Sequence, residues 1–119
     1  MNLLWIFIGG GLGSILRYSL SLFFPFNPAA GFPWATFFSN LAACVILGVL
    51  LLIINARETD NFLRPFFIIG LCGGFSTFSA FSLETVQMIR HNHWPLALLN
   101  IGVSLGACLA VLFILSKKA

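Results

Sequence analysis

Ten consecutive residues, Gly73 to Ser82 (GGFSTFSAFS), combine groups that could handle ions: two glycines, four hydroxyls and three phenylalanines. Carbonyl oxygens freed at a break in a membrane helix can bind a cation. Phenyl rings carry a positive edge around a negative face, so a ring edge can attract an anion. Phe78 and Phe81 are three residues apart and share a helical face. The segment therefore predicts an ion site, although in a chain with 14 phenylalanines plain packing is the simpler alternative for the pair.

The composition places this segment in a membrane. The chain has 119 residues, of which 60% are hydrophobic and 8% are charged, whereas soluble domains carry about 25% charged residues. A helix takes about 20 apolar residues to cross a bilayer. We therefore expect one all-α membrane domain over residues 1–119, with four spans and no soluble head. The expected spans are residues 2–24, 34–54, 65–89 and 96–115.

The span ends carry residues that favour membrane interfaces. Trp5, Trp34 and Trp94 fall near the expected ends, where amphipathic rings are enriched. Four spans place both termini on one side, and the basic residues give only a weak orientation signal. Four basic residues are expected on the side of the termini and two on the other. The four are Arg57, Arg64, Lys117 and Lys118, and the two are Arg17 and Arg90. So small a bias permits insertion in both directions and pairing of two oppositely inserted copies.

Glycine patterns predict a break and close helix contacts. Adjacent glycines cost about 1 kcal/mol each relative to alanine, so we expect the third span to break over Gly73-Gly74 and the Ser76-Thr77 pair that follows. Broken backbone at membrane depth needs protein or a cavity to satisfy it. Small residues also recur four apart, which predicts close helix packing in lipid. These pairs are Gly9 and Gly13, Gly10 and Ser14, Cys44 and Gly48, Gly70 and Gly74, and Gly102 and Gly106.

Few polar side chains lie within the spans, and such groups usually face a partner or a water-filled cavity. An asparagine there either joins helices or lines a polar path. A charge near a span end either reaches out to the interface or serves a site. The residues concerned are Thr36, Asn40, Asn100, Ser104, Arg17 and Glu84.

Metal and enzyme chemistry are disfavoured. Cys44, Cys72 and Cys108 are far apart in sequence within apolar runs, whereas metal sites use closely spaced Cys and His. We therefore interpret the cysteines as small buried residues. His91 and His93 form an H-x-H pair in a polar loop, where a metal site is a minor alternative. The sequence shows no acid–base pair and no nucleophile beside a base, so an enzyme is not expected.

Three motifs together resemble the Fluc (CrcB) fluoride channel family: GGGLGSILRY at 9–18, Thr36 with Asn40, and GLCGGFSTFSAFSLE at 70–84. The resemblance implies a fluoride-selective channel of the cytoplasmic membrane that exports fluoride passively and gives fluoride resistance. It also implies a dual-topology, antiparallel dimer with two pores at the subunit interface. The partner would be a second copy of this chain or a paralogue, and no nucleic acid is involved.

The resemblance also assigns residues. A central structural Na⁺ would be held by backbone carbonyls at positions that match Gly73 and Ser76. Ala80 and Asn100 depart from the family's common hydroxyl residue and tyrosine, and they leave the composition of the polar track open. Ser76 and Ser14 replace a commoner threonine and alanine. We expect a fluoride pore lined by Thr36, Asn40, Phe78, Ser79, Phe81, Ser82, Asn100 and Ser104, and a vestibule lined by Arg17 and Glu84.

The residue chemistry agrees with fluoride as the transported ion. Conduction needs several weak contacts rather than one strong charge, and no basic residue lies near Phe78 in the sequence. The main alternative is a small multidrug-resistance-type exporter, which also uses four spans and antiparallel pairs. Such a proton-coupled cation exporter needs an acid within the membrane, and Glu84, near the end of its span, is the only acid in any expected span. A membrane assembly factor is a third alternative, but it leaves the break beside the ring pair unexplained.

Overall fold

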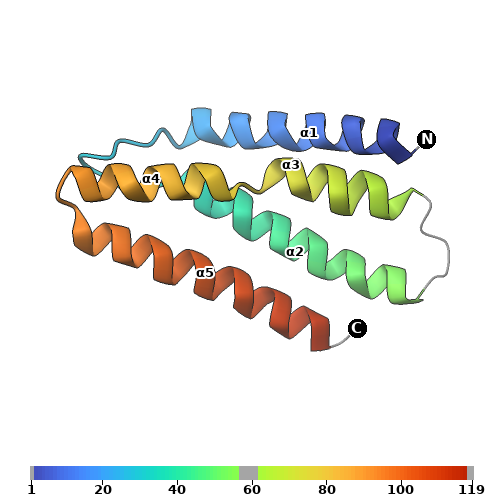
Figure 1. Cartoon of the computed structure of the whole chain (residues 1–119). Coiled ribbons are helices and arrows are strands. Elements are labelled where there is room, and N and C mark those ends of the chain that lie inside the picture. Colours follow the sequence, from blue (N-terminus) through green and yellow to red (C-terminus); the bar gives the residue numbers. More distant parts are fainter. Residues whose placement is uncertain (1, 57–61, 118–119) are drawn as a thin grey trace.

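The computed structural model describes residues 2–56 and 62–117, and every regular element within them is a helix (Figure 1). Four segments are long and apolar enough to cross a membrane: Asn2–Phe23, Trp34–Ile54, Leu63–Arg90 and Trp94–Lys117. These segments begin and end within a few residues of the expected spans. The elements are α1 (Asn2–Phe23), α2 (Trp34–Ala56), the π-helix η1 (Leu63–Cys72), α3 (Gly73–Phe75), α4 (Phe78–Arg90) and α5 (Trp94–Lys117).

The four spans form a flat bundle. In Figure 1, η1, α3 and α4 follow one another along one line, and α1 lies beside them. The helix α2 crosses this pair at a tilt, and α5 packs against α2 and α4. Both termini lie at the same end of the bundle, as an even number of spans requires. Arg57 and Lys118, which contributed to the orientation signal, lie outside the described residues.

Glycine allows α1 and the third span to meet backbone to backbone. A Cβ added at Gly9 would overlap the Phe66 carbonyl oxygen, and one added at Gly13 would overlap that of Leu71. On the facing helix, a Cβ at Gly74 would overlap the carbonyl oxygen of Gly10. The prediction of close packing is therefore confirmed for these two spans. By contrast, a Cβ added at Gly102 or Gly106 on α5 would meet no atom of another described segment within 4 Å.

The third span breaks, but not at its glycine pair. Gly73 has helical dihedral angles (φ −64°, ψ −36°), and Gly73–Phe75 form the short helix α3. The extended residues are Ser76 (φ −85°, ψ 153°) and Thr77 (φ −153°, ψ 120°). The expected break in this span is confirmed, and it lies at the Ser76-Thr77 part of the expected segment and not at the glycines. The contact between Gly74 and Gly10 shows what the pair provides instead, which is room for α1.

The polar residues around α4 define its ends. Thr77 is the N-cap, and its hydroxyl accepts a hydrogen bond from the Ala80 N–H at 3.1 Å, a favourable N-terminal cap. At the other end, Asn92 adopts a left-handed conformation (φ 61°), which asparagine tolerates better than most residues. This turn allows α5 to begin at Trp94.

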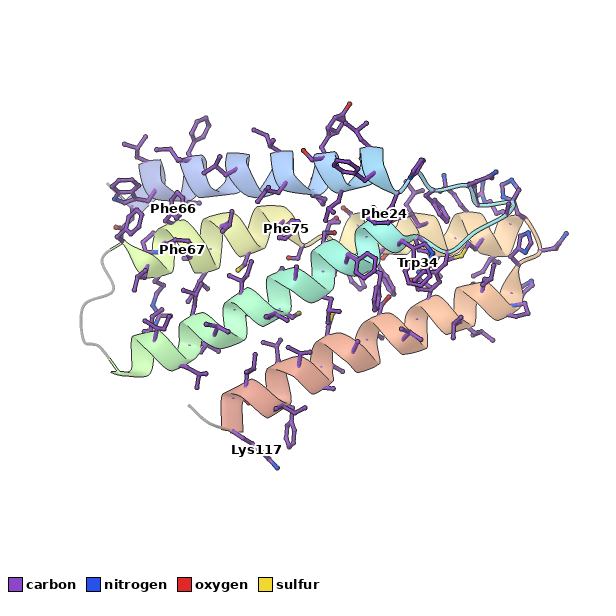
Figure 2. All side chains as sticks on the ribbon, turned by 180° about the vertical axis from the view of Figure 1, so that it is seen from behind. Phe24, Trp34, Phe66, Phe67, Phe75 and Lys117 are labelled. Carbon is purple, nitrogen blue, oxygen red and sulfur yellow. The ribbon has the colours of Figure 1, made fainter. Side chains whose placement is uncertain are left out.

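Aromatic side chains gather in two clusters (Figure 2). Trp5 packs edge-on against Phe62 with ring centroids 4.7 Å apart, and Phe66 and Phe67 continue this cluster at one end of the molecule. Trp34 and Phe24 belong to the second cluster, at the start of α2, where Phe38 contacts both rings. The tryptophans thus lie near helix starts, as expected for residues at membrane interfaces.

Candidate functional site

A side chain of α2 holds the break in the third span. The Thr77 N–H donates to Asn40 Oδ1 at 2.7 Å, and Asn40 Nδ2 donates to the Thr77 carbonyl at 3.4 Å. Backbone groups released at membrane depth need such partners because no water replaces them. Asn40 therefore links α2 to the third span, which is one of the two interpretations that the sequence allowed.

These contacts release carbonyl oxygens on the other side of the break. In a continuous helix the Thr77 N–H would donate to the Gly73 carbonyl, and the Ala80 N–H would donate to the Ser76 carbonyl. Here Asn40 and the Thr77 hydroxyl take those two N–H groups. The carbonyls of Gly73 and Ser76 lose their helical partners as a result. The Gly74 carbonyl between them accepts from Arg17 Nε at 3.3 Å, so Arg17 turns inward to the break.

A pocket of about 220 Å³ opens beside the break. It brings together four of the residues expected to line the pore, and it adds two cysteines that were not expected there. Every lining side chain is neutral, so the pocket offers apolar surface and dipoles without a fixed charge. The lining residues are Asn40, Cys44, Ser76, Thr77, Phe78, Phe81, Ser104, Leu105 and Cys108.

Phe78 and Phe81 form a ring pair at the mouth of this pocket. Their centroids are 5.8 Å apart and their planes are inclined at 34°. Phe81 is 8% exposed and belongs to the packed interior, whereas Phe78 is 75% exposed. The two rings thus share one helical face, but only Phe81 is enclosed by this chain.

A row of polar groups lies behind Phe81, between α4 and α5. Ser104 Oγ donates to Asn100 Oδ1 at 3.1 Å, and Asn100 Nδ2 donates to Thr85 Oγ1 at 3.0 Å. Thr85 Oγ1 in turn donates to the Phe81 carbonyl at 2.7 Å. Asn100 is 1% exposed and does not line the pocket. Thr85 was not singled out from the sequence, although it follows Phe81 by one helical turn.

The two expected vestibule residues meet in a separate pocket of about 320 Å³. Arg17 and Glu84 both line it, together with Thr36, whose hydroxyl donates to the Glu84 carboxylate. Thr36 was expected in the pore, and in this chain it belongs instead with the vestibule pair. Ala80, one turn before Glu84 on α4, also lines this pocket.

Two other expected pore residues stand apart from both pockets. Ser79 Oγ lies 3.0 Å from the Thr77 hydroxyl on the exposed side of α4, and Ser82 lines neither pocket. His91 and His93 each contact a backbone carbonyl, that of Gln87 at 2.8 Å and of Ala29 at 2.6 Å respectively. Across residues 2–56 and 62–117, no three His, Cys, Asp or Glu side chains are grouped to hold a metal.

Comparison with known proteins identifies relatives over nearly the whole chain. The family model described as CrcB-like protein, Camphor Resistance (CrcB), matches residues 4–115. A fluoride-specific ion channel FluC of Phocaeicola vulgatus is 42% identical over 94 residues, which cover 79% of this chain and 78% of the relative. The protein of the same name from Flavobacterium psychrophilum is 39% identical and covers 87% and 84%. That of Magnetococcus marinus is 35% identical over 96% and 94%.

Proposed function

This chain belongs to the CrcB-like protein family, and from that membership and its pocket we infer that it is a fluoride-specific ion channel of the cell membrane. The observation that carries the inference is the neutral pocket in which Phe78 and Phe81 stand beside Asn40 and Ser104. The multidrug exporter is set aside, because the family is one of channels and Glu84 lies in the vestibule pocket beside Arg17. The channel is not an enzyme.

The pocket can replace fluoride's water without trapping the ion. Ring edges attract an anion weakly, and conduction requires sites that an ion can leave. Asn40 Nδ2 carries two N–H groups and uses one on Thr77, so its second can face the ion. The Ser104 hydroxyl already donates to Asn100. It would donate to fluoride only by giving up that bond, which keeps the net gain small.

A second copy of the chain is proposed to complete each pore. One chain is a slab of 50 × 31 × 19 Å, and it leaves Phe78 75% exposed at the pocket. A bare ring cannot enclose a dehydrated ion, so another surface must cover it. An antiparallel copy would supply that surface and would give two equivalent pores. The open glycine face of α5, with Gly102 and Gly106, leaves further room for close helix contact.

The break also fits the structural Na⁺ that the family resemblance implies. The released oxygens of Gly73 and Ser76 are hard ligands of the kind such cations prefer, and no side chain is needed to place them. A Cβ added at Gly73 would meet no atom of another described segment within 4 Å, so this side of the break leaves room for a partner chain. A bound Na⁺ would supply positive charge that holds the released carbonyls of two chains together.

Fluoride efflux from liposomes that contain only the purified chain tests the function. We expect rapid fluoride efflux and chloride efflux at least a hundredfold slower, because a pocket that substitutes for tightly held water favours the small ion. Liposomes prepared without protein give the leak. Equal efflux of the two anions, or fluoride efflux no faster than the leak, would contradict the proposal.

A further inference from the structure

Two cysteines from different helices line the neutral pocket. Cys44 follows Asn40 by one turn on α2, and Cys108 follows Ser104 by one turn on α5. Both cysteines line the pocket, and the helices that carry them, α2 and α5, pack against each other. Both are reduced and partly exposed. The sequence interpretation of three separate buried cysteines is therefore wrong for this pair.

We propose that Cys44 and Cys108 form a site for a single two-coordinate thiophilic metal ion, of which Hg²⁺ is the simplest example. Each thiol releases its proton to solvent as a sulfur–metal bond forms, so binding one Hg²⁺ releases two protons. No electron is transferred, and no bond of the protein other than the two S–H bonds is broken. Thiolates are soft ligands that select soft metals over the oxygen-seeking cations of the membrane surface.

The residues around the two cysteines favour a metal ion with two ligands. Tetrahedral ions such as Zn²⁺ take four protein ligands in closed sites, and the described residues supply no third His, Cys, Asp or Glu to this pair. Two thiolates and one divalent ion also sum to zero charge. A neutral complex avoids the large cost of placing net charge in an apolar site. A two-coordinate divalent ion therefore fits where a four-coordinate ion does not.

The third cysteine provides an internal control. Cys72 is buried in the core cluster with Ala43 and Phe75, and it does not line the pocket. It packs in this cluster against Ala43, the residue before Cys44 on α2, so it is the competing partner that an experiment must separate. Its lack of exposure favours Cys108, which reaches the same open space as Cys44.

The expected effect of metal binding on fluoride conduction rests on the proposed function. Cys108 continues the helical face of Asn100 and Ser104 by one turn, and its thiol shares the pocket with Phe78 and Phe81. A metal bridge between α2 and α5 would occupy part of a 220 Å³ space and fix the two helices together. We expect such a bridge to stop fluoride conduction.

Binding is measured on the purified full chain, titrated with HgCl₂ in the presence of glutathione as a competing monothiol. Ultraviolet absorbance reports the thiolate–mercury bonds, and a thiol-reactive dye counts the remaining thiols. The chain itself and its Cys72→Ser variant should each bind one Hg²⁺ with loss of two thiols. Cys44→Ser and Cys108→Ser should bind at least tenfold more weakly. Tight binding that survives Cys108→Ser but is lost in Cys72→Ser would overturn the site.

Fluoride efflux then tests the consequence separately. Hg²⁺ should reduce efflux at least tenfold in the unmodified chain and in Cys72→Ser, and dithiothreitol should restore it. Cys44→Ser and Cys108→Ser should keep most of their own metal-free efflux when Hg²⁺ is added. Efflux that continues with the site filled would overturn the block. Absence of fluoride efflux before any metal is added would instead contradict the proposed function, and the titration would still decide the thiol site.

Discussion

The side chain of Asn40 on α2 satisfies both backbone polar groups of Thr77 in the third span. It accepts a hydrogen bond from the Thr77 N–H at 2.7 Å and donates one to the Thr77 carbonyl at 3.4 Å. Asn40→Ala removes both contacts and leaves a donor and an acceptor unpaired at membrane depth. An unsatisfied buried polar group costs about 1–3 kcal/mol, so we expect the variant to lose about 2–4 kcal/mol of stability. Thermal or denaturant unfolding in detergent measures the loss.

Ser39→Ala is the matched control for Asn40→Ala. Ser39 is the adjacent residue on α2, fully buried, and its hydroxyl donates only to the Thr36 carbonyl of its own helix. Its removal leaves no backbone group without its helical partner, so we expect a loss below about 1 kcal/mol. If both variants unfolded alike, the link between Asn40 and Thr77 would not be what stabilises the break.

Gly13 on α1 tests the backbone contact with the third span. A Cβ at this position would overlap the Leu71 carbonyl oxygen and lie 2.7 Å from the Phe75 amide nitrogen. Because backbone atoms cannot move aside singly, Gly13→Ala should cost about 3 kcal/mol or more, at the upper end of overpacking in cores. Gly11→Ala on the same helix meets nothing within 4 Å and should be neutral or slightly stabilising. The yield of folded protein and its melting temperature compare the two, and equal behaviour would contradict the close approach of α1 to the third span.

Hydropathy was sufficient to predict the four spans because each one is a long apolar run bounded by polar loops. The four-residue spacing of Gly9 and Gly13 predicted their close helix contact, but the same spacing at Gly102 and Gly106 does not correspond to a contact among the described residues. The position of the break was predicted less well. Intrinsic propensity penalises Gly73 and Gly74 within a helix, but the gain from packing α1 against Gly74 outweighs that penalty.

The partners of polar residues could not be predicted because they depend on how the helices are rotated against one another. Thr36 and Asn40 lie one turn apart on α2, yet they face different pockets. Thr36 bonds to Glu84, and Asn40 bonds to the backbone of Thr77. The same limitation concealed the meeting of Cys44 with Cys108, whose separation in sequence carries no information about their distance in space.

The Na⁺ site is predicted to be structural. Its proposed ligands, the Gly73 and Ser76 carbonyls, are backbone groups that do not gain or lose a proton. A site made of them therefore has no protonation step that could release the ion in each transport cycle. Replacing Na⁺ by a large organic cation should therefore weaken the dimer, measured by subunit exchange or size-exclusion chromatography. Fluoride flux at fixed dimer content should not follow an imposed Na⁺ gradient. Flux that reversed with that gradient would show co-transport and contradict the prediction.

Variants of Phe78 and Phe81 can distinguish packing from anion attraction, because Phe81 is buried within this chain and Phe78 is exposed. Isoleucine keeps each site apolar but removes the ring's electropositive edge. Phe81 is 8% exposed, so Phe81→Ile should lower stability by about 1–2 kcal/mol, whereas Phe78, at 75% exposure, contributes little packing within the chain. If the ring edges attract fluoride, both variants should lose at least tenfold in flux per folded dimer. Phe78→Ile should do so with the melting temperature of the single chain nearly unchanged.

Flux per dimer and melting temperature, measured on the same preparations, distinguish the two interpretations of the ring pair. Phe81→Leu is the control for bulk at the buried position, and like isoleucine it lacks the ring edge, so it should lose flux to a similar degree while packing differently. If both rings only fill space, the reverse pattern is expected. Stability would then fall in proportion to burial at Phe81, and Phe78→Ile would conduct fluoride as the unmodified chain does. That result would leave the neutral hydrogen-bond donors around Asn40 as the groups of this pocket that could attract the ion.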